Sequence, residues 1–337
     1  MTTTIEADYL VIGAGAMGMA FTDTLITETD ATVVVVDRYH QPGGHWTVAY
    51  PYVRLHQPSA FYGVNSRQLG SDSIDRGGWN EGLYELASAA EVCAYFDQVM
   101  HQQLLPTGRV SYFPMSECDG DGRFHSTVSG DEFEVKIRRR VVDSTYLHVT
   151  VPSMRPPKYA VAEGARCVAP NALPALRDRA GHYTVIGAGK TGIDACLWLL
   201  GQGVDPAHLT WIMPRDSWLL NRQNLQPGPL FADAVIAQQL ARHEDISKAE
   251  SVDDLFDRFE ASGGLLRISD NVRPSMYRCA TVTRAELAQL RRIDDIVRLG
   301  HVQRIGTDTI ELDHGTIPTT TETVHIDCTA DGLSDAR

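Results

Sequence analysis

Tyr9-Leu10-Val11-Ile12-Gly13-Ala14-Gly15-Ala16-Met17-Gly18 is the stretch that decides the fold of this 337-residue chain. An apolar run without polar alternation, typical of a strand buried on both faces, leads directly into three glycines at GxGxxG spacing. A helical pattern follows, with Met17, Phe21 and Leu25 expected on one face, and then the strand-like run 32–36, which ends at Asp37. This order of strand, glycine turn, helix and strand predicts a unit that binds a dinucleotide.

Each part of this unit has a predicted role. Gly13 allows the tight turn, Gly15 lets the backbone approach a pyrophosphate, and Gly18 lets helix and strand pack closely. The free N–H groups and the dipole at the helix N-terminus favour a phosphate there. The carboxylate of Asp37 is expected to accept hydrogen bonds from a ribose. The neighbouring residues Ala16, Met17 and Arg38 complete this predicted contact set.

The pattern occurs a second time. Tyr183–Ile186 is followed by Gly187, Gly189 and Gly192, and then by a helix whose apolar face carries Ile193, Leu197 and Leu200. The next strand spans 209–213. The repeat predicts a second dinucleotide-binding unit, in which Lys190 and Thr191 lie inside the glycine loop and Lys190 adds positive charge beside a pyrophosphate.

The residues after Asp37 carry a resemblance to a known family. Gly43-Gly44-His45-Trp46 resembles the GGxW segment of flavin-containing and Baeyer–Villiger monooxygenases, and Tyr50–Tyr62 resembles the YPxxRxDxPSxxY stretch of the Baeyer–Villiger group. In that family the second stretch runs beside the isoalloxazine ring. The resemblance therefore implies FAD and assigns contacts to Gly44, His45, Trp46, Arg54, His56 and Gln57. The segment 326–332 resembles the family's ATG-type motif, which implies that Ala330 and Asp331 lie near the flavin.

Arg215 follows the last strand of the second unit, where an acidic residue is absent. Relatives in the family place an arginine near the same point. A guanidinium can bind a 2′-phosphate through paired N–H donors, so NADPH rather than NADH is implied. Trp218, Asn221 and Arg222, a few residues further on, are candidates to face the nicotinamide or the substrate.

The sequence also departs from the family. The monooxygenase fingerprint aligns best with 162–172, where only Gly164 matches and Val168 replaces the histidine. The family's first ATG reads Asp143-Ser144-Thr145, and His56 replaces an aspartate beside the ring. His56 is a catalytic candidate that could exchange a proton near neutral pH, or equally a structural hydrogen-bonding residue. A flavin oxidase or dehydrogenase, or a non-catalytic flavin-binding protein, therefore remains an alternative.

Together these patterns predict an α/β protein with two Rossmann-like domains. Residues 1–150 and 303–337 are assigned to the FAD-binding domain, and 151–302 to the NAD(P)-binding domain. A mainly helical insertion at about 217–300 is expected to shape the substrate site. In relatives another helix normally follows the last motif, so the chain is either abbreviated or lacks a tail.

Composition narrows the function classes. A net charge of −13 argues against nucleic-acid and anionic-membrane partners, and the chain has neither an apolar run of membrane-spanning length nor a signal peptide. The six cysteines form no CxxC or CxxxxC pair, which disfavours a disulfide reductase, predicts no metal site and suggests a cytoplasmic location. The expected protein is an FAD-dependent, NADPH-using oxidoreductase of monooxygenase type, with a small organic substrate and molecular oxygen as partners.

Overall fold

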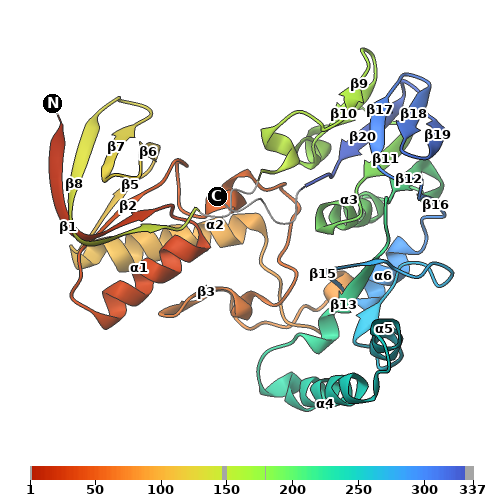
Figure 1. Cartoon of the computed structure of the whole chain (residues 1–337), viewed down its shortest axis with the longest axis horizontal. Coiled ribbons are helices and arrows are strands. Elements are labelled where there is room, and N and C mark those ends of the chain that lie inside the picture. The colour runs from red at the N-terminus through yellow and green to blue at the C-terminus, as the bar shows by residue number, and fades with distance from the viewer. Residues whose placement is uncertain (1, 146–149, 179, 331–337) are drawn as a thin grey trace.

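The structure is a computed structural model that describes residues 2–145, 150–178 and 180–330. Two lobes are visible in Figure 1, each built on its own main sheet. The first sheet has the order β5-β2-β1-β8-β7-β6. Its strands are β1 (Thr3–Ile12), β2 (Val33–Val36), β5 (Val110–Phe113), β6 (Ser116–Cys118), β7 (Arg123–Ser126) and β8 (Glu132–Asp143). Strands β5, β2, β1 and β8 are parallel, as the apolar runs predict for β1 and β2, and β6–β7 is an antiparallel hairpin.

The four valines of β2 show why the first sheet is covered on both faces. Val33 and Val35 pack in one cluster with α1 (Ala16–Glu28) and α2 (Ala89–Gln98), which lie beside each other below the sheet in Figure 1. Val34 and Val36 pack in a second cluster with the phenylalanines of β7 and β8. Successive side chains of a strand point to opposite faces, so an unbroken apolar run needs two covers. The small hairpin β3 (Gly63–Val64) and β4 (Arg67–Gln68) lies next to α1.

The second main sheet is parallel and has the order β10-β20-β11-β12-β16. Helices α3 (Lys190–Gly201) and α6 (Arg284–Leu290) pack in the cluster on one face. The other face is covered by the four-stranded sheet β19-β18-β17-β9. These strands are β9 (Ala160–Val161), β10 (Arg166–Val168), β11 (His182–Ile186), β12 (Leu209–Ile212), β16 (Asp295–Val297), β17 (Val302–Ile305), β18 (Thr309–Leu312), β19 (Gly315–Pro318) and β20 (Thr323–Asp327).

The strand pairing contradicts the assignment of 303–327 to the first domain. β20 pairs along its length with β11, and all five of its residues are buried. Strands β17–β19 cover the same sheet. The sequence identified a buried strand correctly, but its neighbours are set by tertiary pairing, which a periodicity does not encode.

The insertion after β12 is less helical than expected. It contains α4 (Ala232–Lys248) and α5 (Val252–Ala261), but also a three-stranded sheet of β13 (Ser217–Asn221), β14 (Leu265–Leu266) and β15 (Met276–Val282). α4 has no buried residue and lies with α5 at the lower edge of Figure 1. Among the described residues, no helix has both the length and the apolar character needed to cross a membrane.

The two glycine-loop helices differ in how well their buried faces were predicted. In α3, Ile193, Leu197 and Leu200 are all buried, as expected. In α1 the expectation was wrong for Met17, which is 72% exposed. In the first turn of α1 the buried face lies on the side of Met19, which packs in the core cluster, and Met17 lies outside that face. The fully buried apolar side chain of that turn is Met19.

Candidate functional site

The first glycine loop has the geometry that its spacing predicts. Gly13 has φ +98°, a conformation that favours glycine, and a Cβ atom on Gly18 would lie 1.9 Å from the carbonyl oxygen of Gly13. The Gly43–Gly44 turn approaches the same loop, since a Cβ atom on Gly44 would lie 2.9 Å from the Cα atom of Gly15. The GGxW segment and the first fingerprint therefore form one backbone-lined surface at the N-terminus of α1.

Asp37 is buried behind this loop. Its carboxylate accepts hydrogen bonds from the backbone N–H groups of Ala14 and Tyr39, the latter at 2.7 Å. Burial is the largest effect on the pKa of Asp37 and raises it, whereas the two hydrogen bonds lower it. Asp37 thus helps to hold the glycine turn in shape. Arg38, beside it, is exposed and lies over the ring of Tyr39.

The second glycine loop repeats these features with one difference. Gly187 has φ +121°, and a Cβ atom on Gly192 would lie 2.0 Å from the carbonyl oxygen of Gly187. That carbonyl also accepts a hydrogen bond of 2.8 Å from the indole of Trp211. Around Gly189, by contrast, a Cβ atom would meet nothing within 4 Å. The middle glycine therefore faces open space at the N-terminus of α3, where a phosphate group is favoured.

A cavity of about 250 Å³ joins the two units. One wall comes from the segment after the first glycine loop, and the other contains Lys190 and Thr191 at the start of α3. Six of the residues singled out in the sequence therefore meet here, although 134 positions separate His56 from Lys190. The lining residues are His45, Trp46, Val48, Ala49, Tyr50, Val53, Arg54, Leu55, His56, Tyr62, Val151, Pro152, Pro170, Asn171, Lys190 and Thr191.

His56 is the most constrained polar residue of this cavity. Its Nδ1 atom accepts the backbone N–H of Thr281 at 3.3 Å, so the neutral ring carries its proton on Nε2. Burial, together with the positive charges of Lys190 and Arg222, lowers the pKa of His56 to about 3. The low pKa disfavours proton exchange by His56 near neutral pH, and a catalytic role for this residue stays a prediction. A neutral hydrogen-bond donor is what the geometry supports.

Lys190 forms a second polar group in the cavity wall. Its ammonium group contacts both carboxylate oxygens of Asp194, one turn further along α3. The hydroxyl of Tyr50 donates to the same carboxylate at 2.8 Å. The side chains of Lys190 and Asp194 are only 20% and 12% exposed. The sequence identified Lys190 but missed Asp194, whose i,i+4 spacing from Lys190 was the available signal.

Arg215 lies at the carboxyl end of β12 and is exposed. Within the described part of the chain it makes no hydrogen bond or ion pair. Arg298 follows the neighbouring strand β16 and binds Asp216 through two hydrogen bonds of 2.7 and 3.0 Å. At the carboxyl edge of the second sheet, the guanidinium of Arg298 is thus paired with a carboxylate, whereas the guanidinium of Arg215 has no such partner among the described residues.

Three candidates from the insertion make contacts within the protein. Arg222 is buried and donates to the carbonyl oxygens of His56 and Thr281, and it forms an ion pair of 2.9 Å with Glu286. The indole of Trp218 stacks on a phenylalanine of α5, and the side chain of Asn221 donates to the carbonyl oxygen of Gly263 and accepts the backbone N–H of Gln223. All three side chains are buried and contact other parts of the protein, and a role for them in facing a ligand stays a prediction.

The remaining candidates lie outside the cavity wall. Gln57 is partly buried and does not line the cavity. Ala330 lies three residues after the end of β20, a strand of the second sheet. Asp331 lies outside the described residues. At the position of the family's first ATG, Ser144 donates to the carbonyl oxygens of Ile12 and Gly13 and so closes the first glycine turn.

The segment that aligns with the monooxygenase fingerprint lines the cavity with residues that follow Val168, and not with Val168 itself. Val168 packs against the core of the second sheet, whereas Pro170 and Asn171 line the cavity. The amide of Asn171 donates to the carbonyl oxygen of Val48 at 3.0 Å and so ties the two units together. Sequence reasoning missed Asn171 because it aligned with no residue of the fingerprint.

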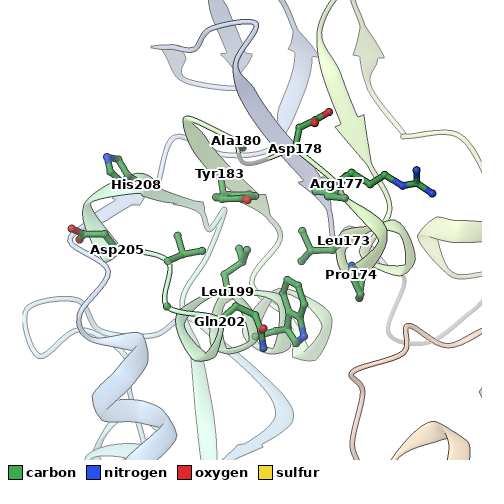
Figure 2. A pocket seen from close by; sticks show the side chains of 14 residues that line it. Leu173, Pro174, Arg177, Asp178, Ala180, Tyr183, Leu199, Gln202, Asp205 and His208 are labelled. Carbon is green, nitrogen blue, oxygen red and sulfur yellow. The ribbon is translucent and has the colours of Figure 1, made fainter.

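A larger cavity of about 510 Å³ lies at the other end of α3 (Figure 2). The charged side chains labelled there, Arg177, Asp178, Asp205 and His208, are exposed around its rim. It is remote from the second glycine loop, which lies at the N-terminus of α3. Among the described residues no group of three or more potential metal-ligating side chains occurs.

Comparison with known proteins gives relatives in sequence and in structure. No family model matches the chain. Uncharacterized proteins of Mycobacterium tuberculosis and Mycobacterium bovis are 66% identical over 331 residues, which cover 98% of this chain and 61% of theirs. The chain thus spans 61% of the length of these curated relatives.

Solved structures extend the comparison at lower identity. A flavin-containing monooxygenase from Stenotrophomonas maltophilia matches with a TM-score of 0.55 and 16% identity, over 98% of this chain and 78% of the other. Cyclohexanone monooxygenase in its open form matches with a TM-score of 0.56 and 16% identity, over 99% and 74%. Steroid monooxygenase bound to NADP matches with a TM-score of 0.57 and 14% identity, over 97% and 72%. The chain therefore has the two-domain fold of the class B flavin-dependent monooxygenases.

Proposed function

We propose that this protein is an FAD-dependent, NADPH-using oxidoreductase of monooxygenase type that acts on a small organic substrate. The observation that carries the proposal is the cavity of about 250 Å³ between the two glycine-loop units. One wall is the segment that resembles a flavin-facing stretch, and the other is the start of the helix that follows the second fingerprint. A ring held from the first loop and a ring held from the second would meet in this space.

The first loop fits the pyrophosphate of FAD. Gly15 and Gly44 leave two backbone segments without side chains at the N-terminus of α1, where the free N–H groups favour negative charge. The cavity beyond is lined by Trp46, Val53 and Leu55, so it offers the apolar walls that a flat aromatic ring needs. When bound, FAD supplies electron acceptance from a nicotinamide and reaction with oxygen.

The second loop fits NADPH. The open space at Gly189 admits a dinucleotide backbone close to the N-terminus of α3. Arg215 is exposed at the carboxyl end of the adjacent strand, where the adenosine half of a dinucleotide binds in open α/β sheets. Its guanidinium supplies the paired donors that suit a 2′-phosphate.

In this proposal the chain's own residues orient and shield the reacting groups. His56 presents a neutral N–H donor to an acceptor oxygen in the cavity, and Lys190 presents a positive charge. The apolar side chains of Val48, Val53 and Leu55 limit access of water, which strengthens both interactions. The six cysteines are all free thiols, which suits the cytoplasmic location that we propose.

The test begins with the purified protein, which we expect to be yellow or to bind added FAD. Anaerobic NADPH should bleach the absorbance near ~450 nm faster than NADH does, and air should restore it. A protein that binds no FAD contradicts the proposal as a whole. A flavoprotein that NADPH never bleaches contradicts the proposed electron donor.

A second candidate is a flavin oxidase that releases hydrogen peroxide instead of oxygenating a substrate. Val168 favours it, because an apolar side chain packed into the second sheet replaces the fingerprint histidine. The two candidates differ in the fate of oxygen. Hydrogen peroxide formed in equal amount to the NADPH consumed, in the presence of every substrate tested, favours the oxidase; formation of an oxygenated product favours the monooxygenase.

A further inference from the structure

The ion pair between Lys190 and Asp194 occupies an unusual place. A lysine inside a glycine loop is expected to contact phosphate, yet Lys190 is bound to Asp194 and faces the cavity between the two units. Tyr50, from the first unit, donates the third hydrogen bond to this carboxylate. The triad therefore spans both units and fixes the lysine on the wall of the cavity.

The positive charge of Lys190 acts inside the cavity. It is one of the two charges that depress the pKa of His56, which lines the same wall. The carboxylate of Asp194 is more deeply placed, and burial raises its pKa against the opposing effect of Lys190. The positive end of the pair thus faces the cavity, and the negative end lies behind it. Such a pair is neutral as a whole but favours negative charge in the cavity.

We propose that Lys190 is the residue that sets the reduction potential of the bound flavin, and that Asp194 and Tyr50 are positioning residues that hold its charge on the cavity wall. This inference rests on the proposed function. Reduction adds two electrons to the flavin ring and leaves it with more negative charge than the oxidised form. A fixed positive charge beside the ring therefore binds the reduced form more tightly than the oxidised form and raises the potential.

The pair makes two predictions of opposite sign. K190M removes the positive charge at the cavity wall and lowers the potential. D194N removes the balancing negative charge behind it and raises the potential. If the pair only supported the fold, both substitutions would loosen the same wall and move the potential in the same direction. Y50F keeps the ring and removes one hydrogen bond to Asp194, so it gives a smaller change than either.

The experiment is an equilibrium titration of the FAD-loaded full chain against a reference dye, with two-electron reduction followed by absorbance. We expect K190M and D194N each to change the ratio of affinities for reduced and oxidised FAD at least tenfold, in opposite directions. Tenfold is ~30 mV for a two-electron couple. The binding constant of oxidised FAD and the melting temperature of each variant are measured in parallel.

The matched control is K248M. Lys248 forms the same i,i+4 pair with Glu244, but on the exposed helix α4. Its removal leaves the potential unchanged. If K190M does not fold, the double variant K190Q/D194N replaces it, because it leaves no buried unpaired charge; it should have a lower potential than D194N.

Three outcomes overturn the inference while the proposed function stands. The first is a wild-type reduction potential in both K190M and D194N loaded with FAD. The second is a change of the potential in the same direction in both variants. The third is a change in K248M as large as the change in K190M. A wild-type protein that binds no FAD overturns the proposed function itself, and with it the inference.

Discussion

The Nδ1 atom of His56 accepts the backbone N–H of Thr281 at 3.3 Å, across 225 positions of sequence. This contact joins the cavity segment of the first unit to strand β15 of the insertion. It fixes the tautomer of a ring whose pKa is lowered to about 3, first by burial and then by two neighbouring positive charges. Burial and these charges therefore favour the neutral form of His56.

The first prediction concerns stability against pH. The pKa of His56 is lower in the folded than in the unfolded chain, where it is near 6.5. As the pH falls from about 6.5 toward 3, the unfolded state takes up a proton that the folded state does not. His56 then costs about 1.4 kcal/mol of unfolding free energy per pH unit. H56Q should flatten the urea-unfolding curve against pH in this window. H243Q, on the exposed side of α4, should not; equal slopes for H56Q and the wild type contradict the prediction.

The second prediction separates two glycines of the same loop. In G192A the new Cβ atom meets the carbonyl of Gly187 at 2.0 Å, so the helix must shift and the melting temperature should fall by several degrees. In G189A the Cβ atom enters open space at an ordinary φ, so stability should be retained. If NADPH occupies that space, G189A should weaken its binding at least tenfold, measured by calorimetry. An unchanged NADPH affinity in folded G189A would place the dinucleotide elsewhere.

The third prediction concerns the choice of nucleotide. R215Q should raise the dissociation constant of NADPH about 10- to 100-fold, the loss of ~1.4 to 3 kcal/mol expected for a charge-assisted contact. The affinity for NADH and the melting temperature should not change, because Arg215 is exposed. R298Q is the comparison variant, because it breaks both hydrogen bonds to Asp216 and should lower the melting temperature. Equal losses for NADPH and NADH in R215Q would argue against a 2′-phosphate contact.

The fourth prediction concerns the buried pair of Arg222 and Glu286. R222M leaves a carboxylate without its partner and should cost about 3–5 kcal/mol of unfolding free energy in urea. E286Q keeps a side-chain oxygen that accepts the backbone N–H of Thr283, a contact that caps α6. The double variant R222M/E286Q should therefore recover part of the loss. A double variant as unstable as R222M alone would mean that lost packing, and not the unpaired charge, dominates.

Local patterns were sufficient for the two dinucleotide units. Gly13, Gly18, Gly187 and Gly192 have the conformations and close approaches that GxGxxG spacing requires, because that spacing is itself a steric rule of a strand turning into a helix. The apolar runs of β1, β2, β11 and β12 became parallel strands for a similar reason. A strand that is covered on both faces is mostly apolar.

Local patterns were not sufficient for the edges of the domains. The position of β20 in the second sheet, and the three-stranded sheet inside the insertion, depend on pairings between segments tens of residues apart. Met17 was expected on a buried face because its spacing is helical. Spacing shows which residues share a face but not where the core ends.

The sequence by itself therefore determined the α/β class, the two glycine loops and the residues that surround them. Only the tertiary structure decided the chemistry of the cavity between them. It placed His56 where burial and nearby charges favour the neutral ring, made Arg222 the partner of a buried ion pair, and joined Lys190 to Asp194 and Tyr50. The physical reason is that a backbone turn is specified by the residues within it. The protonation and orientation of a side chain depend instead on burial and on charges supplied by distant segments.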